Sequence, residues 1–274
     1  MSGNNDFRFG IAVGLEDLPA RQPVVLRGDI AHVAETAAGI GYDGLELHIR
    51  NPAGYDGARL RAEAEKRKLA FAGIATGMEY TRNNLSLIAE DETARHAAVA
   101  RLREHMDLAA ILDCPVVIGI MRSNIPDFEQ YERYEGYLRD SLLRLDEYAD
   151  KTGVPLVFEA ITRYINNYLN TLKETADFLA SLGSKYIALH IDTHSMNIED
   201  VDFAESIAYC GNRIGYVHYS DSNRWYPGGG HVDFPGIHQA LRKINYHGYI
   251  TVESLPEPDQ VTCAVRGFEY MRTL

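Results

Sequence analysis

Short apolar runs alternate with helical patterns along the whole 274-residue chain, and this alternation restricts the fold more than any other feature. The helical segments carry apolar residues at three- and four-residue spacing, most clearly in 92–112 and 131–151. Strands that alternate with helices predict βαβ units and a parallel sheet. Eight units favour a closed (β/α)8 barrel, a TIM barrel of one domain, 1–274, because such barrels have about 250 residues. The expected strands are 7–13, 44–48, 71–75, 115–120, 154–159, 186–192, 214–218 and 248–253.

The last four expected strands each end at a side chain that can bind a metal ion. These residues are Glu159, Asp192, His218 and Glu253. In a parallel barrel the carboxyl ends of the strands share one face, so we expect the four side chains to converge there. Three carboxylates at one mouth repel one another, and a divalent cation removes that cost. Three oxygens and one nitrogen suit Mn²⁺, Mg²⁺ or Co²⁺ and suit structural zinc less well.

Each of these residues also has an ordinary structural explanation when it is taken singly. Glu159 and Glu253 are compatible with helix capping or a surface position. Asp192 is compatible with capping the helix that follows it, and His218 with a hydrogen-bonded core histidine. The presence of all four at successive strand ends is what favours a metal site.

The composition argues against several classes of function. The net charge is −12, with 39 acidic and 27 basic residues, whereas nucleic-acid-binding proteins normally present a basic face. No apolar run reaches the roughly 18 residues of a membrane helix, and the first residues lack the pattern of a signal segment. We therefore expect a cytoplasmic protein that binds neither nucleic acid nor membrane. Three widely spaced cysteines predict free, buried thiols in a reducing compartment: Cys114, Cys210 and Cys263.

Several segments resemble a known family. The most specific is 222–231, Ser-Asn-Arg-Trp-Tyr-Pro-Gly-Gly-Gly-His; others are 169–171 (Leu-Asn-Thr), 76–77 (Thr-Gly), 85–87 (Leu-Ser-Leu) and 252–256 (Val-Glu-Ser-Leu-Pro). With these motifs, nearly the whole chain resembles the sugar isomerase/epimerase superfamily with the xylose-isomerase-like barrel. Within it the resemblance is closest to the ketose 3-epimerases, acting on D-tagatose or D-psicose, and to the 5-keto-L-gluconate epimerases.

The resemblance implies an Mn²⁺-type ion bound by Glu159, Asp192, His218 and Glu253. It also implies that Glu159 and Glu253 form the catalytic acid/base pair and that Arg224 contacts the substrate. A homodimer or homotetramer is the expected assembly. The chemistry agrees with the residue types, because a cation that polarises a ketose carbonyl stabilises an enediolate and two carboxylates can exchange the proton.

The chain departs from the family motifs at two positions. Segment 159–165 reads Glu-Ala-Ile-Thr-Arg-Tyr-Ile, so Ile165 stands where relatives have a second glutamate. Segment 192–197 reads Asp-Thr-His-Ser-Met-Asn, so Ser195 stands where a substrate-contacting histidine is expected, and His194 lies one position earlier. Both Ser195 and His194 are kept as candidate substrate contacts. These changes leave the metal site intact but put the identity of the substrate, and to a lesser degree the reaction, in question.

Other polar residues near the expected mouth are less decisive. Arg122, at the end of the fourth expected strand, either pairs with an acid at the rim or contacts the substrate. Arg163 follows Glu159 by four positions and is expected to support the site rather than bind substrate. Glu46 and His48 either satisfy the barrel interior or touch the substrate.

The predicted function is that of a metal-dependent epimerase of a keto-sugar or keto-sugar acid. Alternatives are a sugar isomerase or a lyase or dehydratase on the same barrel, an endonuclease IV-type enzyme, which the acidic charge disfavours, and a non-catalytic sugar-binding homologue. Because Ile165 and Ser195 replace polar contacts, we expect an oxidised or substituted keto-sugar to be a better substrate than D-tagatose or D-fructose. We expect three arginines to supply the polar contacts with the substrate that Ile165 and Ser195 lack: Arg122, Arg163 and Arg224.

Overall fold

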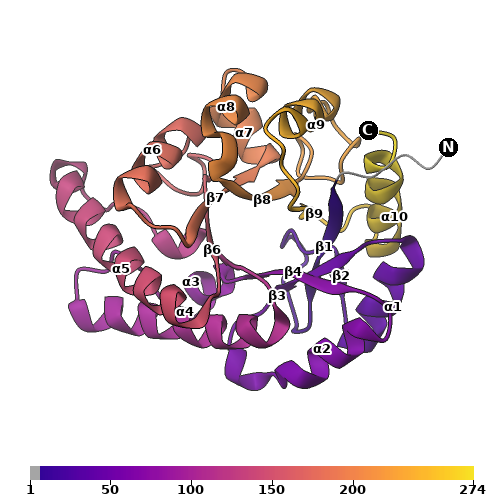
Figure 1. Ribbon diagram of the computed structural model, residues 1–274, viewed down its shortest axis with the longest axis horizontal. Helices are drawn as coiled ribbons and strands as arrows, with labels where there is room; N and C mark the ends of the chain where they lie inside the picture. Colours follow the sequence, from indigo (N-terminus) through magenta and orange to yellow (C-terminus); the bar gives the residue numbers. More distant parts are fainter. Residues whose placement is uncertain (1–6) are drawn as a thin grey trace.

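The computed structural model describes residues 7–274, whose strands form one parallel sheet that closes on itself (Figure 1). The strand order is β2-β1-β3-β4-β5-β6-β7-β8-β9, and β9 also pairs with β1. Eight strands thus close the barrel, and the two-residue β2 pairs only with β1, which confirms the predicted TIM barrel. The strands are β1 (Arg8–Gly14), β2 (Leu26–Arg27), β3 (Gly44–His48), β4 (Ala70–Ala75), β5 (Val116–Ile118), β6 (Leu156–Glu159), β7 (Ile187–Asp192), β8 (Ile214–Tyr219) and β9 (Tyr249–Val252).

The longer helices surround this ring (Figure 1). They are α1 (Ile30–Ile40), α2 (Gly57–Glu65), α4 (Glu92–Leu112), α5 (Tyr131–Thr152), α6 (Leu172–Leu182), α8 (Phe203–Cys210), α9 (Phe234–Lys243) and α10 (Gln260–Met271). The shorter α3 (Gly77–Asn83) and α7 (Thr193–Glu199) follow directly after β4 and β7, and 3₁₀ turns are η1 (Pro52–Gly54), η2 (Ile120–Arg122), η3 (Phe128–Gln130) and η4 (Gly211–Arg213). Within residues 7–274, no helix combines the length and the hydrophobicity needed to span a membrane.

Local sequence signals set the helix boundaries. The predicted helix 92–112 is observed with these bounds, since Asp91 caps it by accepting a hydrogen bond from the Thr93 amide at 3.0 Å. The predicted helix 131–151 runs one residue further and ends at Gly153, whose φ of 74° is the left-handed conformation that glycine adopts at low cost. Capping aspartates also precede α1, α2, α7, α8, α9 and α10.

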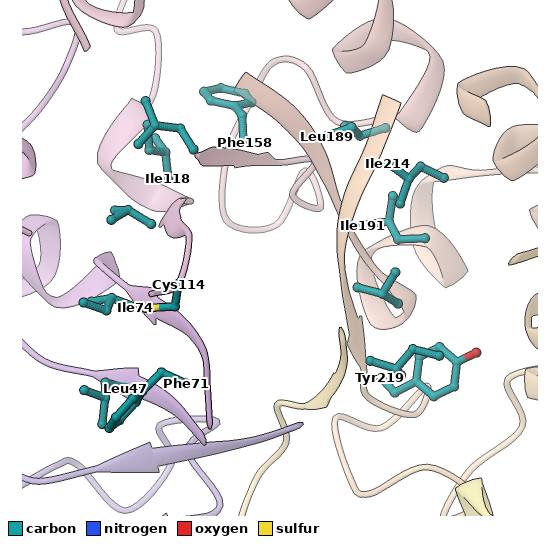
Figure 2. Packing of buried hydrophobic residues seen from close by; sticks show 14 of the residues in the cluster. Leu47, Phe71, Ile74, Cys114, Ile118, Phe158, Leu189, Ile191, Ile214 and Tyr219 are labelled. Atoms are coloured by element: carbon teal, nitrogen blue, oxygen red, sulfur yellow. The ribbon is translucent and has the colours of Figure 1, made fainter. Parts of the chain in front are cut away.

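The main core lies between the barrel and the helices, because alternate residues of each strand point away from the axis. Leu47, Ile74, Ile118, Phe158 and Ile191 are buried on this outer side (Figure 2). The side chains between them face the axis and form a smaller interior cluster that comprises Ala72, Ala75, Val117, Val157, Tyr216 and Tyr249. The three cysteines are buried free thiols, as predicted.

The fourth expected strand is shorter than the apolar run 115–120. The strand β5 ends at Ile118, and the chain then turns through Gly119 into η2. A Cβ atom at Gly119 would lie 2.6 Å from Oε2 of Glu159, so the backbone passes close to that carboxylate. This turn changes the direction of the residues that follow, including Arg122.

Candidate metal centre

The four predicted ligands meet at the carboxyl ends of neighbouring strands. Glu159 ends β6, Asp192 ends β7, His218 lies one residue before the end of β8, and Glu253 directly follows β9. The strand register pairs Asp192 with His218. One ligand atom each from Asp192, His218 and Glu253 lies within 4.8 Å of the others, and these three side chains are buried. The structure therefore brings the predicted set together at one mouth.

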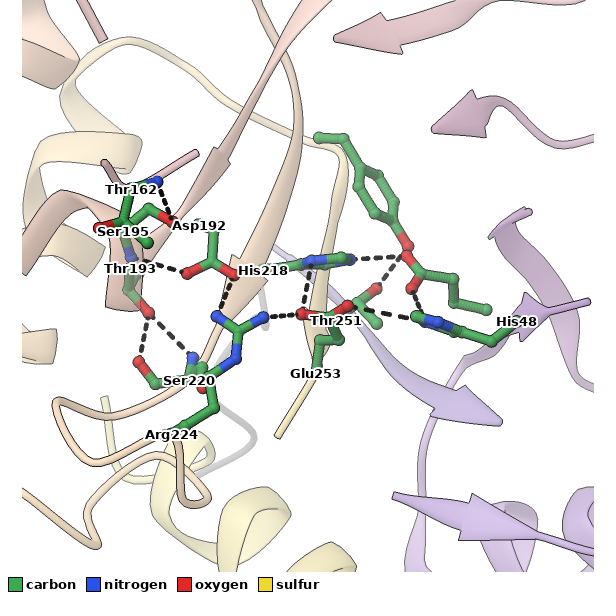
Figure 3. A network of polar contacts seen from close by, with 12 residues as sticks. His48, Thr162, Asp192, Thr193, Ser195, His218, Ser220, Arg224, Thr251 and Glu253 are labelled. Atoms are coloured by element: carbon green, nitrogen blue, oxygen red, sulfur yellow. Dashed lines mark hydrogen bonds and ion pairs between the residues drawn. The ribbon is translucent and has the colours of Figure 1, made fainter. Parts of the chain in front are cut away.

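A guanidinium group lies between two of these carboxylates (Figure 3). Arg224 donates a hydrogen bond to Oδ2 of Asp192 at 2.5 Å and another to Oε2 of Glu253. Asp192 also caps α7 by accepting a hydrogen bond from the Ser195 amide at 3.0 Å. Asp192 can therefore cap α7 and also face the mouth, because Oδ1 accepts from the Ser195 amide and Oδ2 accepts from Arg224.

The three carboxyl groups at the mouth differ in pKa: that of Glu159 is raised, and those of Asp192 and Glu253 are lowered. Burial and the charges of Asp192 and Glu253 raise the pKa of Glu159 to about 8. For Asp192, burial acts in the opposite direction to Arg224 and His218, whose charges prevail and lower its pKa to about 2. The pKa of Glu253 is also lowered, again by Arg224 and His218 against the effect of burial. Arg224 thus neutralises two carboxylates, and Glu159 keeps its proton at neutral pH when no further cation is bound.

The donor atoms present suit a hard or borderline divalent cation. Nδ1 of His218 is buried, makes no hydrogen bond, and lies 3.5 Å from Oε2 of Glu253. Carboxylate oxygens and an imidazole nitrogen within 4.8 Å of one another match the ligand types of Mn²⁺, Mg²⁺ and Co²⁺. A cation among Glu159, Asp192 and Glu253 would also remove the repulsion that raises the pKa of Glu159. The residues therefore fit a metal ion, although its identity does not follow from them.

The buried carboxylate of Glu46 orients His218 from behind the mouth. Nε2 of His218 and Nε2 of His48 each donate a hydrogen bond of 2.7 Å to Glu46, one to each carboxylate oxygen. Burial alone would raise the pKa of Glu46, but the two histidines lower it well below its usual value. Burial alone would lower the pKa of His218, but the charges of Glu46 and Glu253 raise it well above its usual value, so both ring nitrogens are protonated in the absence of a metal ion. Because Nε2 is held by Glu46, a cation at the mouth would replace the proton on Nδ1, an arrangement typical of metal-binding histidines.

A second imidazole lies beside this site. His190 precedes Asp192 by two residues on β7, is fully buried, and has no hydrogen bond at either ring nitrogen. Its ring meets that of His218 edge to face, with centroids 4.1 Å apart. Ligand atoms of Glu159, His190 and His218 lie within 4.8 Å of one another, so His190 is an additional nitrogen donor.

Comparison with known proteins identifies the family. The family model described as "Xylose isomerase-like TIM barrel" matches residues 34–274. The chain belongs to this family. It is 31% identical to L-ribulose 3-epimerase of Methylomonas sp. (strain DH-1) over 223 residues, 80% of this chain and 76% of that protein. It is also 31% identical to D-psicose 3-epimerase of Agrobacterium fabrum over 227 residues, covering 80% and 77% of the two chains.

A solved structure supports the same relationship. D-allulose 3-epimerase from Methylomonas sp. in complex with D-allulose superposes with a TM-score of 0.80 at 25% sequence identity. The match covers 97% of this chain and 98% of that one. The chain is thus a xylose isomerase-like TIM barrel similar to ketose 3-epimerases, as the sequence motifs predicted.

Of the predicted substrate contacts, Arg122 has to be corrected. The turn at Gly119 carries Arg122 beneath the loop that follows β6, where it is fully buried. Its guanidinium donates to the carbonyl oxygens of Glu159 and Leu169, both at 3.1 Å, and burial lowers its pKa to about 10. Arg122 is not among the described residues that line the pocket at the mouth; its guanidinium contacts the backbone at Glu159 instead.

The other predicted contacts divide between the pocket and its surroundings. Arg224, Ser195 and Ile165 line the pocket. Nδ1 of His194 faces the carbonyl of Asp221 at 3.2 Å instead, outside the lining. Arg163 also turns away, and pairs with Glu199 through hydrogen bonds of 2.6–3.1 Å. Of the three arginines expected to bind the substrate, Arg224 alone lines the pocket, whereas Arg122 and Arg163 are held by other groups of the protein.

The family motif 222–231 folds around a buried aspartate. Asp221 accepts hydrogen bonds from the amides of Ser222, Gly228 and Val232 at 2.7, 2.9 and 3.1 Å. A Cβ atom at Gly230 would lie 2.3 Å from Oδ1 of Asp221, which explains a glycine at that position. The loop thereby presents Arg224 to Asp192 and Glu253 at the mouth, with Gly230 packed against Asp221.

Proposed function

We propose that the protein is a divalent-metal-dependent epimerase of a keto-sugar or keto-sugar acid, with Mn²⁺ as the ion. The observation that carries this proposal is the position of Glu159 and Glu253, a half-buried and a buried carboxylate that face one pocket from β6 and from the end of β9. Asp192 and His218 lie between them on β7 and β8. The ketose 3-epimerases among the relatives support the assignment of the reaction class.

Each residue has a definite role in this reaction. A divalent ion bound by Glu159, Asp192, His218 and Glu253 would supply a Lewis acid that polarises the substrate carbonyl. Glu159 and Glu253 face the substrate from different strands, so one removes the proton next to the carbonyl and the other returns a proton to the opposite face of the resulting enediolate. Arg224 is released from its carboxylate partners to hold a substrate oxygen. Because the proton is removed from one face of the carbon and a proton is returned to the other face, the configuration of that carbon is inverted.

The test is the loss of turnover in Glu159→Gln and Glu253→Gln. Each variant is expected to lose turnover by about 10²–10⁴-fold, the usual contribution of a positioned acid or base. Glu199→Gln is the matched control, because Glu199 is a nearby buried glutamate that pairs with Arg163 and does not line the pocket. Near-normal turnover in either of the first two variants would remove that residue from the mechanism.

The position of solvent deuterium distinguishes the reaction from its alternatives. Epimerisation in D₂O should place one deuterium at the inverted carbon, with no migration of the carbonyl and no loss of water. Migration of the carbonyl would identify a sugar isomerase, and release of water a lyase or dehydratase on the same barrel. Retention of the original hydrogen at the inverted carbon would contradict the proton exchange between Glu159 and Glu253.

A further inference from the structure

The pocket is larger than the candidate metal centre, and its far side carries two arginines. The candidate ligands come from β6 to β9, whereas Arg21 lies in the loop between β1 and β2 and Arg82 lies on α3 after β4. The strands that these segments follow, β1 and β4, belong to the other half of the ring (Figure 1). We propose that Arg21 and Arg82 bind an anionic group, a carboxylate or a phosphate, at the end of the keto-sugar remote from its reacting carbonyl. This proposal rests on the proposed function and specifies its substrate class.

The loop that carries Arg21 is fixed in place. Arg27 donates hydrogen bonds to the carbonyl oxygens of Leu18, Pro19, Ala20, Gln22 and Val24 at 2.8–3.3 Å. One guanidinium therefore binds five carbonyl groups of this loop, whose residues Pro19, Arg21, Gln22 and Pro23 line the pocket. The backbone at Arg21 is preorganised, which lowers the cost of ordering it around a ligand.

The helix that carries Arg82 is anchored with similar strength. Glu79 on α3 is fully buried and accepts hydrogen bonds from Arg101 and His105 at 3.0 Å and from Asn83 at 2.6 Å. Arg101 and His105 belong to α4, so the short helix α3 is fastened to the outer layer. The side chain of Arg82 then extends from a fixed backbone into the pocket lining.

Neither arginine has a charged partner within the described residues. Arg21 and Arg82 make no ion pair or hydrogen bond through their side chains with residues 7–274. A shortage of carboxylates does not explain this, since the chain has 39 acidic and 27 basic residues. Two unpaired guanidinium groups beside one pocket match the planar, bidentate geometry of a carboxylate or phosphate.

The size of the pocket agrees with an extended ligand. Its volume is about 550 Å³, within the range of about 300–1,000 Å³ typical of ligands of drug size. A free ketohexose at the metal centre would leave the far side unfilled. An anionic group there would also replace the polar contacts that Ile165 and Ser195 do not supply, because Ile165 is apolar and Oγ of Ser195 accepts a hydrogen bond from the Thr162 amide at 3.3 Å.

The experiment compares neutral and anionic sugars in the Mn²⁺-loaded enzyme. D-Fructose is the neutral substrate, and a 5-keto-hexonate and D-fructose 6-phosphate are the anionic ones, so that the two anions separate a carboxylate site from a phosphate site. We expect kcat/KM to be at least tenfold higher for one anion. Arg21→Gln and Arg82→Gln should each reduce the anion-to-neutral ratio of kcat/KM by about tenfold, as expected for a hydrogen bond to a charged group. Arg59→Gln is the control, because Arg59 is also exposed and unpaired within residues 7–274 but lies outside the pocket.

The outcomes separate this proposal from the proposed function. If neutral sugars react as efficiently as both anions, or if Arg21→Gln and Arg82→Gln leave the ratio unchanged, the anion site is wrong while the epimerase assignment stands. If no sugar reacts, the anion site is tested by calorimetry, which measures the binding of gluconate and 6-phosphogluconate. Binding that is weakened in both variants and not in Arg59→Gln supports the anion site, and equal affinity in all variants overturns it.

Discussion

Substitution of Glu46 by glutamine should weaken metal binding although Glu46 is not itself a proposed ligand. The carboxylate accepts one hydrogen bond of 2.7 Å from His218 and one from His48, and it is fully buried. An amide has one accepting oxygen, so it cannot serve both histidines. If its NH₂ group faces Nε2 of His218, the imidazole proton moves to Nδ1, the nitrogen that faces the mouth. If its oxygen faces His218, a charge-assisted hydrogen bond becomes a neutral one with roughly half the strength.

The expected loss is 10- to 100-fold in Mn²⁺ affinity, or about 1.4–2.7 kcal/mol, the usual effect of removing the carboxylate behind a metal-bound histidine. Titration calorimetry with Mn²⁺ measures it directly. Glu79→Gln is the control, since Glu79 is a buried glutamate that binds His105 at 3.0 Å outside the pocket. Both variants should lower thermal stability, but only Glu46→Gln should lower metal affinity. Equal Mn²⁺ affinity in Glu46→Gln and the unsubstituted protein would refute the proposed orientation of His218.

Three further predictions concern the mouth itself. Asp192→Asn and His218→Ala should each lose stoichiometric Mn²⁺, and full metal content in both, measured by elemental analysis, would exclude these ligands. Arg224→Gln should bind Mn²⁺ more tightly yet turn over more slowly, because the guanidinium competes for oxygens of Asp192 and Glu253; calorimetry and kinetics check the two effects. Without metal, the raised pKa of Glu159, about 8 against an ordinary 4.5, means that the folded protein binds the extra proton. Its contribution to stability is therefore lost as pH rises from about 4.5 to about 8, and denaturant titrations should show this slope vanish in Glu159→Gln.

The eight strands were predictable because each is an apolar run bounded by turn or helix signals. The strand expected at 115–120 is shorter in the structure. Pro-Val-Val-Ile-Gly-Ile reads as one apolar run, but the strand ends at Ile118, and the backbone at Gly119 turns close to the Glu159 carboxylate. Hydrophobicity does not record this contact, which depends on a residue 40 positions later in the sequence. Arg122 was misplaced for the same reason.

The candidate ligands were predictable for a different reason from the residues that support them. Glu159, Asp192 and Glu253 stand where apolar runs end, so a change of polarity marks them. Glu46 and His190 lie inside strands, where a charged or polar residue in an apolar run is an equally visible signal. Their roles could not be assigned from sequence, since they depend on which strand faces which across the barrel axis.

The position of the arginines shows the limit of reasoning from sequence distance. Arg122 and Arg163 lie close to the metal-binding motif in sequence, yet one is buried against carbonyl groups and the other pairs with Glu199. Arg21 and Arg82 are far from the motif in sequence but line the same pocket, because closure of the barrel brings β1 and β4 around to face β6 to β9. An arginine already paired with protein groups must give up those contacts before it binds a substrate, as we propose for Arg224, whereas an unpaired one at a pocket gains a charge-assisted hydrogen bond directly. The proposed anion site therefore rests on position at the pocket and on the lack of a protein partner, not on proximity in sequence.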